Sequence, residues 1–339
     1  MPNVFEDLSE ADRKRHLADV ARRALVHWGL SESTPLTLLN ISENATYRVD
    51  LPNCGEPLIL RVHRTGYHTI DAVRTELAWM TALQEEAQVQ TPQAITAADG
   101  EMIKIIATPA LNEQRMVVMF AFIEGEEPDE SALLEPFSRL GAIAASMHRH
   151  ARGWRRPEYF ERLVWDYAGT LGENANWGRW QDGLGLDDEA RSILGEMDTL
   201  IRDRLQCFGD GPDRFGLIHA DLRLANLLET ANDTRVIDFD DAGLGWFLYD
   251  VATALSFMEG REDVDELVAA WVAGYRLEAP LTDDEVAEIP TFLMLRRLAI
   301  IAWIGSHRDT DLARELGASF TEESVPLARR YIAKFAHSR

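Results

Sequence analysis

The sequence feature that most constrains this chain is a set of polar residues placed after two short apolar runs. The first run ends in a loop that holds His219, Asp221 and Asn226, and the second ends at Asp238. A hydroxyl nucleophile needs a carboxylate within hydrogen-bond reach, and Mg²⁺ prefers hard oxygen ligands such as those of Asp and Asn. The pattern therefore predicts a loop-borne site that combines hydroxyl chemistry with a bound divalent cation.

The spacing His-x-Asp-x-x-x-x-Asn, followed by an acidic residue after the next strand, resembles the catalytic loop and metal-binding segment of the aminoglycoside phosphotransferase-like kinases. Within that family the chain resembles the subgroup of type II homoserine kinases and RdoA/YihE-type stress-response kinases. This second similarity rests on Asp240-Asp241-Ala-Gly, on a Tyr-Asp pair ending at Asp250 and on an Arg-Arg-Leu…Ala-Trp stretch at 296–303. The resemblance covers about residues 35–335.

The resemblance implies an α+β, bilobal protein-kinase-like fold. The N-terminal lobe is expected over residues 1–121, with an N-terminal helix, a small antiparallel β-sheet, one further helix and the phosphate side of an ATP site. The C-terminal lobe is expected over residues 122–339; it is mainly helical and holds the catalytic loop, the metal site and the acceptor pocket.

Hydrophobic periodicity and turn residues predict the elements within these lobes. A capping box that begins at Ser9 and a stop at Gly29 bound the N-terminal helix. Strands are predicted at 36–41, 46–51, 58–63, 101–107 and 115–122, and helices at 134–150, 188–206, 249–259, 263–276, 282–306 and 322–336.

The resemblance also implies roles in the catalytic loop. Asp221 is the expected general base, or the group that orients the acceptor hydroxyl, and Arg223 is expected to stabilise charge on the transferring phosphoryl group. Asn226 and Asp238 are the expected Mg²⁺ ligands.

Other residues near this motif are expected to support the loop or the acceptor. His219 is expected to hold the loop by hydrogen bonds rather than to shuttle protons. Asp250 resembles the buried Asp that ties the loop backbone together. Asp240 takes the place of the glycine in the protein-kinase Asp-Phe-Gly and is a candidate to hold a metal-bound water or the acceptor; Asp241 is a candidate to bind the acceptor.

On the nucleotide side, Arg61 stands on a predicted strand and Glu76 on the helix that follows. Kinases use a strand Lys held by a helix Glu to grip the α- and β-phosphates, so Arg61 resembles a substitute for that Lys; a surface arginine is the alternative. The backbone at the end of the 115–122 strand is expected to face the adenine, at Phe120, Phe122 and Ile123.

The loop expected to cover the ATP phosphates contains no glycine, which departs from the protein-kinase pattern. Its side chains Ser42, Asn44 and Thr46 are nevertheless able to donate to phosphate oxygens, together with backbone N–H groups. An ordinary polar hairpin is the competing interpretation.

Specificity is expected in the C-terminal lobe, because kinases of this group build acceptor pockets from inserts there. The segment 153–186 is rich in tryptophan, and the alternative is that these rings pack as an insertion. For Arg296 and its neighbour Arg297 the alternative is salt bridges to carboxylates. The candidates for acceptor binding, besides Asp240 and Asp241, are Trp154, Trp177, Trp180, Arg296 and Trp303.

Composition excludes several classes of partner. With 34 basic against 57 acidic residues, the formal charge of -23 disfavours nucleic acid and anionic membrane surfaces. The same charge favours a cationic acceptor, although an acidic surface that aids solubility is the simpler explanation. The chain lacks a long uninterrupted apolar window and a signal-like N-terminus, so a cytoplasmic protein is expected.

The leading prediction is an ATP-dependent, Mg²⁺-dependent kinase that phosphorylates a hydroxyl group of an amino alcohol, amino acid or aminoglycoside-like compound, with GTP left open as the nucleotide. Only residues 239–249 separate Asp238 from Asp250, which leaves no room for the long activation segment on which peptide substrates lie. A Ser/Thr protein kinase of the RdoA/YihE type is the second candidate, and a catalytically idle nucleotide-binding module is the third.

Overall fold

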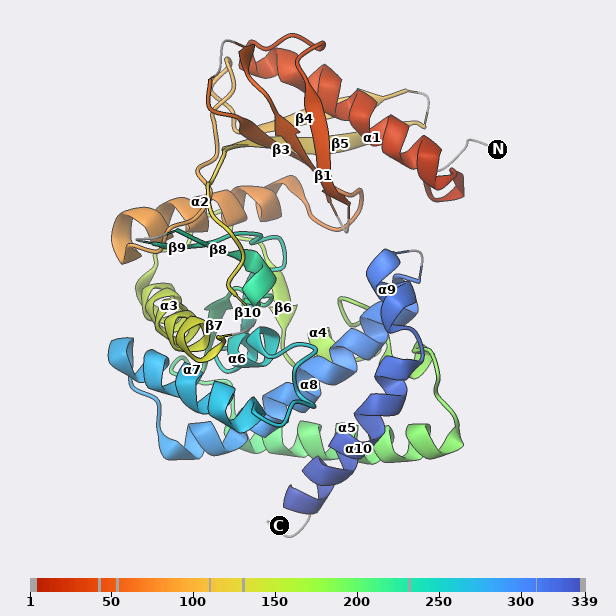
Figure 1. Cartoon of the computed structure of the whole chain (residues 1–339), viewed down its shortest axis with the longest axis vertical. Coiled ribbons are helices and arrows are strands. Elements are labelled where there is room, and N and C mark those ends of the chain that lie inside the picture. Colours follow the sequence, from red (N-terminus) through yellow and green to blue (C-terminus); the bar gives the residue numbers. More distant parts are fainter. Residues whose placement is uncertain are drawn as a thin grey trace. The chain divides into compact units, whose positions relative to one another are not determined.

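The computed structural model of the chain describes residues 5–41, 44–52, 55–109, 111–129, 132–230, 233–308 and 310–335. The chain divides into two compact units (Figure 1). Unit 1 comprises Met1–Gln84, Gln90–Gly125 and Arg156–Glu161. Unit 2 comprises Glu85–Val89, Glu126–Arg155 and Arg162–Arg339.

Unit 1 is built on a five-stranded antiparallel sheet. Its strand order is β1-β2-β3-β5-β4. The strands are β1 (Leu36–Ile41), β2 (Ala45–Val49), β3 (Leu58–Val62), β4 (Ile103–Thr108) and β5 (Glu113–Ala121). All five predicted strands are thereby confirmed, with ends that differ by a few residues.

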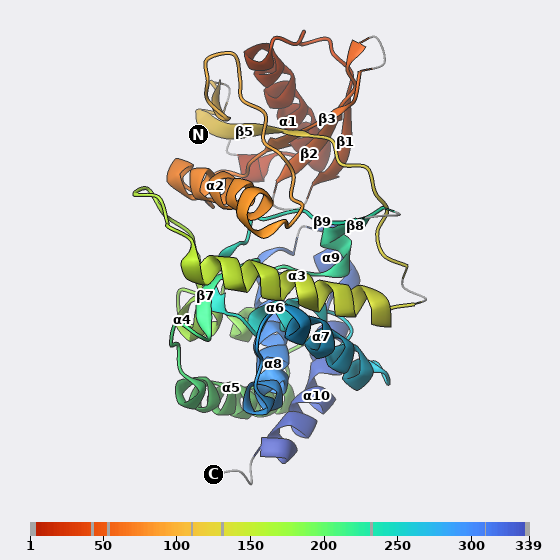
Figure 2. The ribbon, with the colours of Figure 1, turned by 90° about the vertical axis from the view of Figure 1, so that its left-hand side faces the viewer.

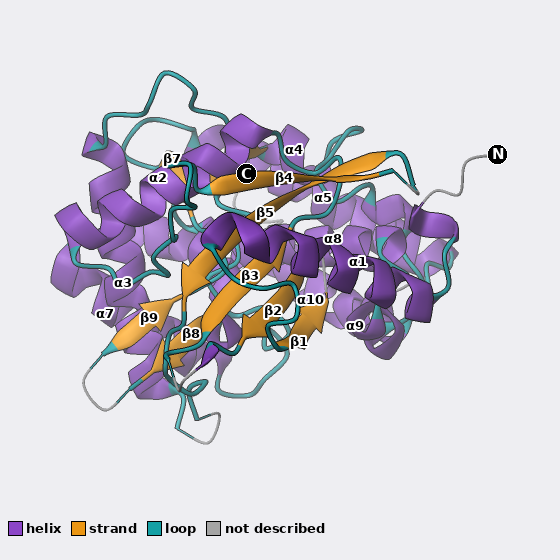
Figure 3. Ribbon diagram, turned by 90° about the horizontal axis from the view of Figure 1, so that it is seen from above, coloured by secondary structure: helices purple, strands orange, loops and turns teal. Residues whose placement is uncertain are grey.

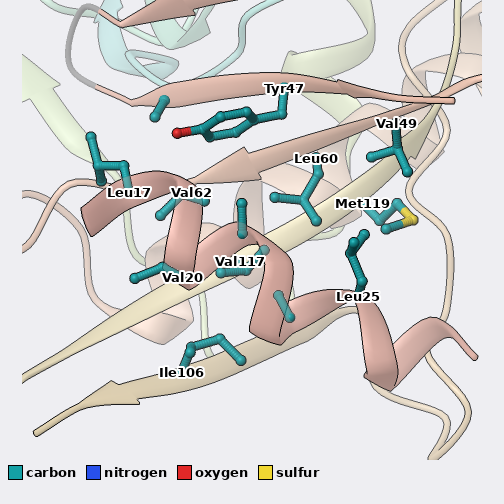
Figure 4. Close-up of a cluster of buried hydrophobic side chains, with 13 residues drawn as sticks. Leu17, Val20, Leu25, Tyr47, Val49, Leu60, Val62, Ile106, Val117 and Met119 are labelled. Atoms are coloured by element: carbon teal, nitrogen blue, oxygen red, sulfur yellow. The ribbon is translucent and has the colours of Figure 1, made fainter. Parts of the chain in front are cut away.

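Helix α1 (Glu10–Leu25) covers one face of this sheet (Figure 3). The helix begins at the predicted residue, because the Ser9 side chain accepts a hydrogen bond from the backbone N–H of Asp12. A short 3-10 helix, η2 (Val26–Trp28), continues it until Gly29 adopts a φ of 71°. Figure 4 shows Leu17, Val20 and other apolar side chains of α1 packed against strand residues of the sheet.

Helix α2 (Ile70–Ala87) also belongs largely to unit 1, where it binds the segment Arg156–Glu161. The Thr75 hydroxyl donates to the carbonyl of Tyr159 at 3.4 Å and accepts from the backbone N–H of Glu161 at 3.1 Å. Thr75 is fully buried, so this pair of hydrogen bonds also satisfies a hydroxyl that burial would otherwise penalise.

Unit 2 is mainly helical. Its helices are α3 (Leu134–Gly153), α4 (Tyr167–Leu171), α5 (Asp188–Phe208), α6 (Tyr249–Ala254), α7 (Val264–Glu278), α8 (Asp283–Ser306), α9 (Asp311–Leu316) and α10 (Ser319–Phe335). Helices α3 and α7 lie side by side (Figure 2). They approach this closely because each presents a glycine: a Cβ on Gly141 would lie 2.0 Å from the carbonyl oxygen of Trp271, and one on Gly274 would lie 1.7 Å from that of Ser138.

Two small sheets in unit 2 position its loops. Strand β10 (Gly243–Trp246) runs parallel to β6 (Leu163–Trp165) and antiparallel to β7 (Phe215–Ile218). Strand β8 (Leu227–Glu229) pairs with β9 (Thr234–Val236). The predicted elements did not include β6 or β10.

Helix α8 is the core helix of unit 2. Among the described helices it alone is long and apolar enough to span a bilayer, but 83% of its most apolar window is buried inside the fold. Helix α6 is shorter than the predicted helix 249–259, which is wrong beyond Ala254. The reason is local: Phe257 adopts a φ of 71°, which a right-handed helix does not allow.

Candidate active site

The catalytic loop follows β7, and its backbone is bound by the side chain of Asp250, which lies in the first turn of α6. Asp250 Oδ1 accepts from the backbone N–H of Ala220 at 2.8 Å, and Oδ2 accepts from that of His219 at 3.2 Å. The fully buried His148 on α3 also contacts Oδ2 through Nε2, at 2.9 Å. The Asp250 carboxylate therefore fixes the loop backbone, as its resemblance to the loop-tying Asp implied.

His219 joins the catalytic loop to the segment that carries Asp238. Its Nδ1 accepts from the backbone N–H of Asp221 at 3.3 Å, so Nε2 carries the proton and donates to the carbonyl of Ile237 at 3.1 Å. The ring is fully buried. Both nitrogens are thus occupied by backbone groups, which suits a residue that supports the loop.

Asp221 is gripped by three side-chain donors. Arg296 Nη2 donates to Oδ1 at 2.6 Å, while Asn226 Nδ2 at 2.8 Å and Arg223 Nε at 3.2 Å donate to Oδ2. Burial alone would raise the pKa of Asp221, but the charges of Arg223 and Arg296 outweigh it and hold the pKa below its ordinary value. Asp221 is therefore ionised at neutral pH.

Arg296 is a direct partner of Asp221, which the sequence did not indicate. It lies on α8 with 3% of its surface exposed and also donates to the carbonyl of Ala220 at 3.2 Å and to Ser256 Oγ at 3.2 Å. Its neighbour Arg297 points elsewhere and binds the buried Glu259 at 2.7 Å. Both arginines thus form the salt bridges considered as the alternative to acceptor contact.

The two segments that frame the site each contain a non-glycine residue with left-handed backbone. Ala220 has a φ of 64° and Asp238 a φ of 63°. Such conformations cost roughly 1–3 kcal/mol and persist only where surrounding contacts impose them. They lie on either side of the hydrogen bonds made by His219, which supplies part of that constraint.

The residues expected to hold Mg²⁺ have suitable donor atoms. Because Asn226 uses Nδ2 to bind Asp221, its Oδ1 is the atom that remains for a cation, and the Asp238 carboxylate belongs to an exposed residue. Among the described residues, no cluster of three or more His, Cys, Asp or Glu side chains has a metal-binding arrangement. Two protein oxygen ligands fit a Mg²⁺ ion whose other ligands are phosphates and water.

Trp177 lies against the arginine that holds Asp221. The Arg296 guanidinium stands 4.7 Å from the centroid of the Trp177 ring and 5.8 Å from that of Tyr249. Trp165 packs edge-on against Trp177 at 5.0 Å and stacks with Tyr249 at 6.0 Å. Two aromatic side chains thus lie against Arg296, and Trp165 packs behind both; the contact between Tyr249 and Arg296 was not predicted.

The other acceptor candidates have different surroundings. Asp241 is half-buried, and its charge acts on Arg296 and Tyr249, whereas Asp240 is buried. The remaining tryptophans have the following described contacts: Trp180 donates to Asp198 Oδ2 at 2.9 Å, Trp154 packs on His150 at 6.2 Å, and Trp303 stacks on His307 at 5.0 Å.

In unit 1, Arg61 and Glu76 form a buried ion pair. Arg61 Nη2 donates to Glu76 Oε1 at 2.6 Å, and the side chains are 8% and 0% exposed. The guanidinium also lies 5.2 Å from the centroid of the Phe120 ring. The strand Arg and the helix Glu are therefore brought together, in the manner expected of a phosphate-gripping pair.

The other residues expected near the nucleotide are placed as follows. Thr46 on β2 is the register partner of Arg61, and Asn44 Oδ1 accepts from the backbone N–H of Arg64 at 3.1 Å. Ser42 lies outside the described residues. Phe122 and Ile123 follow the end of β5, where the Arg48 guanidinium covers the Phe122 ring at 5.1 Å.

The chain is similar to a phosphotransferase family and to several kinases. Residues 37–288 match the phosphotransferase enzyme family. A solved microcompartment-associated aminopropanol kinase is 42% identical, with a TM-score of 0.86 over 93% of this chain and 97% of that one. Amicoumacin kinase of Bacillus subtilis (strain 168) is 24% identical over 84% of each chain, and homoserine kinase of Rhizobium rhizogenes (strain K84 / ATCC BAA-868) is 25% identical over 85% of this chain and 83% of that one.

The predicted α+β, protein-kinase-like fold is confirmed by solved phosphotransferases of the same fold, including a spectinomycin phosphotransferase with a TM-score of 0.61 at 12% identity, over 92% of this chain and 97% of that one. The matched residues include both the Arg61–Glu76 pair and the catalytic loop around Asp221. The chain therefore belongs to the phosphotransferase enzyme family.

Proposed function

We propose that this protein transfers the γ-phosphoryl group of ATP to the hydroxyl group of a small amino alcohol, with Mg²⁺. The observation that carries the proposal is the grip on Asp221, whose two carboxylate oxygens accept from Arg296, Asn226 and Arg223 beside the Asp238 segment. The 42% identity to an aminopropanol kinase over almost the whole chain supports the acceptor class.

Asp221 acts by orienting the acceptor. Its ionised carboxylate accepts a hydrogen bond from the acceptor hydroxyl, aims the oxygen at the γ-phosphorus and takes the proton as the new P–O bond forms, while the bond from the γ-phosphorus to the bridging oxygen breaks and ADP leaves. Arg223, which is partly exposed and close to Asp221, offsets negative charge on the transferring group. Asn226 and Asp238 would hold Mg²⁺, which neutralises phosphate charge when bound. Arg61, fixed by Glu76, would bind phosphate oxygens of the nucleotide.

A small acceptor is supported by the segment between Asp238 and Asp250. Strand β10 occupies its middle and pairs with both β6 and β7, so this stretch is committed to a sheet. A peptide-binding activation segment has no length of chain from which to form. The half-buried Asp241 carboxylate, together with the formal charge of -23, favours an acceptor that carries an ammonium group.

The test is a nucleotide-consumption assay with matched acceptors. We expect Mg²⁺-dependent turnover with 1-amino-2-propanol and ethanolamine, and at least tenfold lower kcat/KM with propane-1,2-diol, which lacks the amine. Homoserine, an aminoglycoside and a generic protein substrate complete the panel, with GTP in place of ATP as a second arm. ³¹P NMR identifies the phosphoester. A higher kcat/KM for the diol, homoserine or the protein than for the amino alcohols would refute the acceptor class.

The expected cytoplasmic location stays a prediction. It is consistent with the burial of α8, the apolar helix of unit 2, within the fold. Fractionation of cells that express the tagged chain tests it directly.

A further inference from the structure

The four residues that follow Asp238 present their backbone carbonyls to two side chains from another part of unit 2. Arg162 Nη2 donates to the carbonyl of Phe239 at 3.1 Å and to that of Asp240, and Arg162 Nε donates to that of Ala242. The indole N–H of Trp165 donates to the carbonyl of Asp241 at 2.8 Å. Four consecutive carbonyls, 239–242, are thus bound by Arg162 and Trp165, which we call the carbonyl clamp.

The fold brings the clamp to this segment through the pairing of β6 with β10. Gly243 is the register partner of Leu163, and Gly245 that of Trp165. A Cβ on Gly243 would lie 2.5 Å from the carbonyl oxygen of Leu163 and 2.9 Å from Trp165 Cδ1, so the two strands approach closely because residue 243 is glycine. Arg162 stands just before β6, where its guanidinium reaches back along residues 239–242.

Burial makes these hydrogen bonds strong determinants of local structure. Arg162 is 8% exposed and Trp165 is fully buried. Hydrogen bonds from a charged donor are stronger than those between neutral groups, and removing a donor takes a partner from a buried carbonyl. The carbonyl of Phe239 also accepts from the backbone N–H of Ala242 at 3.0 Å. The planar guanidinium binds several carbonyls at once because its donors point outward in a fixed fork.

The clamp lies on one side of Asp238, and the catalytic loop holds the other side. Ile237 donates its backbone N–H to the carbonyl of Asn226 at 2.9 Å and accepts from His219 at 3.1 Å. Asp238 itself has the left-handed φ of 63°. A strained residue between two anchored segments keeps a single backbone conformation, so the Cα–Cβ bond of Asp238 keeps a single direction.

We propose that Arg162, assisted by Trp165, is a positioning residue that fixes the backbone from which the Asp238 side chain reaches Mg²⁺. This inference rests on the proposed function, because it takes Asp238 as a metal ligand. Neither side chain touches the reacting groups. Their effect is exerted through the backbone of residues 239–242, so their loss weakens the metal site while leaving Asp221 and its three donors in place.

The test compares Arg162→Lys, Trp165→Phe and the double variant with two matched controls. Arg297→Lys changes a second buried arginine of unit 2, which binds Glu259. Trp246→Phe removes a second buried indole donor, which binds the carbonyl of Gly209 at 2.8 Å. Mn²⁺ binding to the complex with a non-hydrolysable ATP analogue is measured by electron paramagnetic resonance, and amide hydrogen exchange of residues 239–243 is measured without metal.

We expect Mn²⁺ affinity in the double variant to fall roughly 10–100-fold, with faster amide exchange at 239–243 and an unchanged KM for the acceptor. The controls keep parental Mn²⁺ affinity even if their melting temperatures fall. Parental Mn²⁺ affinity and parental exchange in the double variant would overturn the proposal. If the parent protein binds nucleotide with no dependence on a divalent cation, the proposed function fails, and the exchange data alone still decide whether the clamp orders this segment.

Discussion

Replacing Arg296 by methionine isolates the grip on Asp221. The change removes the 2.6 Å contact to Asp221 Oδ1 and the donor to the carbonyl of Ala220, but it keeps an apolar chain against Trp177. Asn226 and Arg223 still bind Oδ2. In the variant, Asp221 Oδ1 therefore loses the guanidinium that binds it, while the carboxylate stays largely buried.

The size of the effect follows from that geometry. Breaking a buried ion pair by removing one partner costs about 3–5 kcal/mol of unfolding free energy. We expect the lower part of this range, because two donors to Asp221 remain and its side chain is 16% exposed. Loss of orientation of the acceptor hydroxyl should lower kcat by roughly 10²-fold, since a displacement of about 1 Å costs that much. The KM for ATP should not change.

The pH profile separates this explanation from simple destabilisation. With Arg296 absent, burial raises the pKa of Asp221 with less to oppose it, so the acid limb of kcat/KM must move to higher pH. Arg296→Lys should restore part of the shift. The control is Arg297→Met, which removes the guanidinium that binds the buried Glu259 but leaves the partners of Asp221 unchanged. An acid limb that stays in place in Arg296→Met, or moves equally in Arg297→Met, would refute the reasoning.

Four further predictions concern the catalytic and metal-binding aspartates, Arg61, Asp241 and His148. Asp221→Asn should keep ATP binding and lower kcat by roughly 10²–10⁴-fold, whereas Asp238→Asn should weaken Mg²⁺·ATP binding as well; calorimetry that fails to separate the two variants would contradict these roles. Arg61→Ala should raise the KM for ATP and Arg61→Lys should restore it only in part, because an ammonium does not reproduce a bidentate fork; steady-state kinetics unaltered by the alanine would exclude the phosphate role. Asp241→Asn should raise the KM for an amino alcohol but not for the matching diol, and an equal rise for both would argue against recognition of the amine by this carboxylate. Burial lowers the pKa of His148 below 6.5, so the unfolded chain binds a proton first and stability should fall by about 1.4 kcal/mol per pH unit below pH 6.5; denaturant melts of the parent and His148→Gln test this, and equal slopes would exclude the histidine as the cause.

Local signals in the sequence were sufficient for the elements of unit 1. Ser9 and Gly29 mark the ends of the N-terminal helix because capping and left-handed backbone are properties of single residues. Strands such as β2 and β5 carry apolar residues, either alternating or in a continuous run, over five to nine positions, and this pattern is the ordinary sequence signal of a strand. The Arg61–Glu76 pair was predicted from the resemblance to kinases, in which a strand Lys is held by a helix Glu.

The catalytic loop was foreseen through the spacing of His219, Asp221 and Asn226, but its surroundings were not. Arg296 is 75 residues away from Asp221 along the chain, and Arg162 is 77 residues away from Phe239. No periodicity reports on contacts at such separations. Strands β6 and β10 escaped prediction because they are only three and four residues long and β10 contains two glycines, which weaken any strand signal.

The tryptophan-rich segment shows why residue type alone does not separate packing from function. Trp180 donates to Asp198, whereas Trp165 binds the backbone beside Asp238 and Trp177 covers Arg296. All three are buried. They are the same residue type with similar burial, and only their contact partners show which of them act on the site.

The environment of Asp221 favours position over basicity. A carboxylate with three donors on two oxygens is a weak base, and its low pKa would be a poor choice for a reaction that must remove a proton early. Phosphoryl transfer has a loose transition state in which the attacking oxygen has formed little bond, so the proton leaves late and alignment of the hydroxyl matters more than its deprotonation. Because Arg296 and Arg223 already offset the charge of Asp221, this carboxylate is poorly suited to attract a substrate ammonium group as well. We therefore expect recognition of an amine to fall to the half-buried Asp241, so that the residue that aligns the hydroxyl is separate from the one that selects the acceptor.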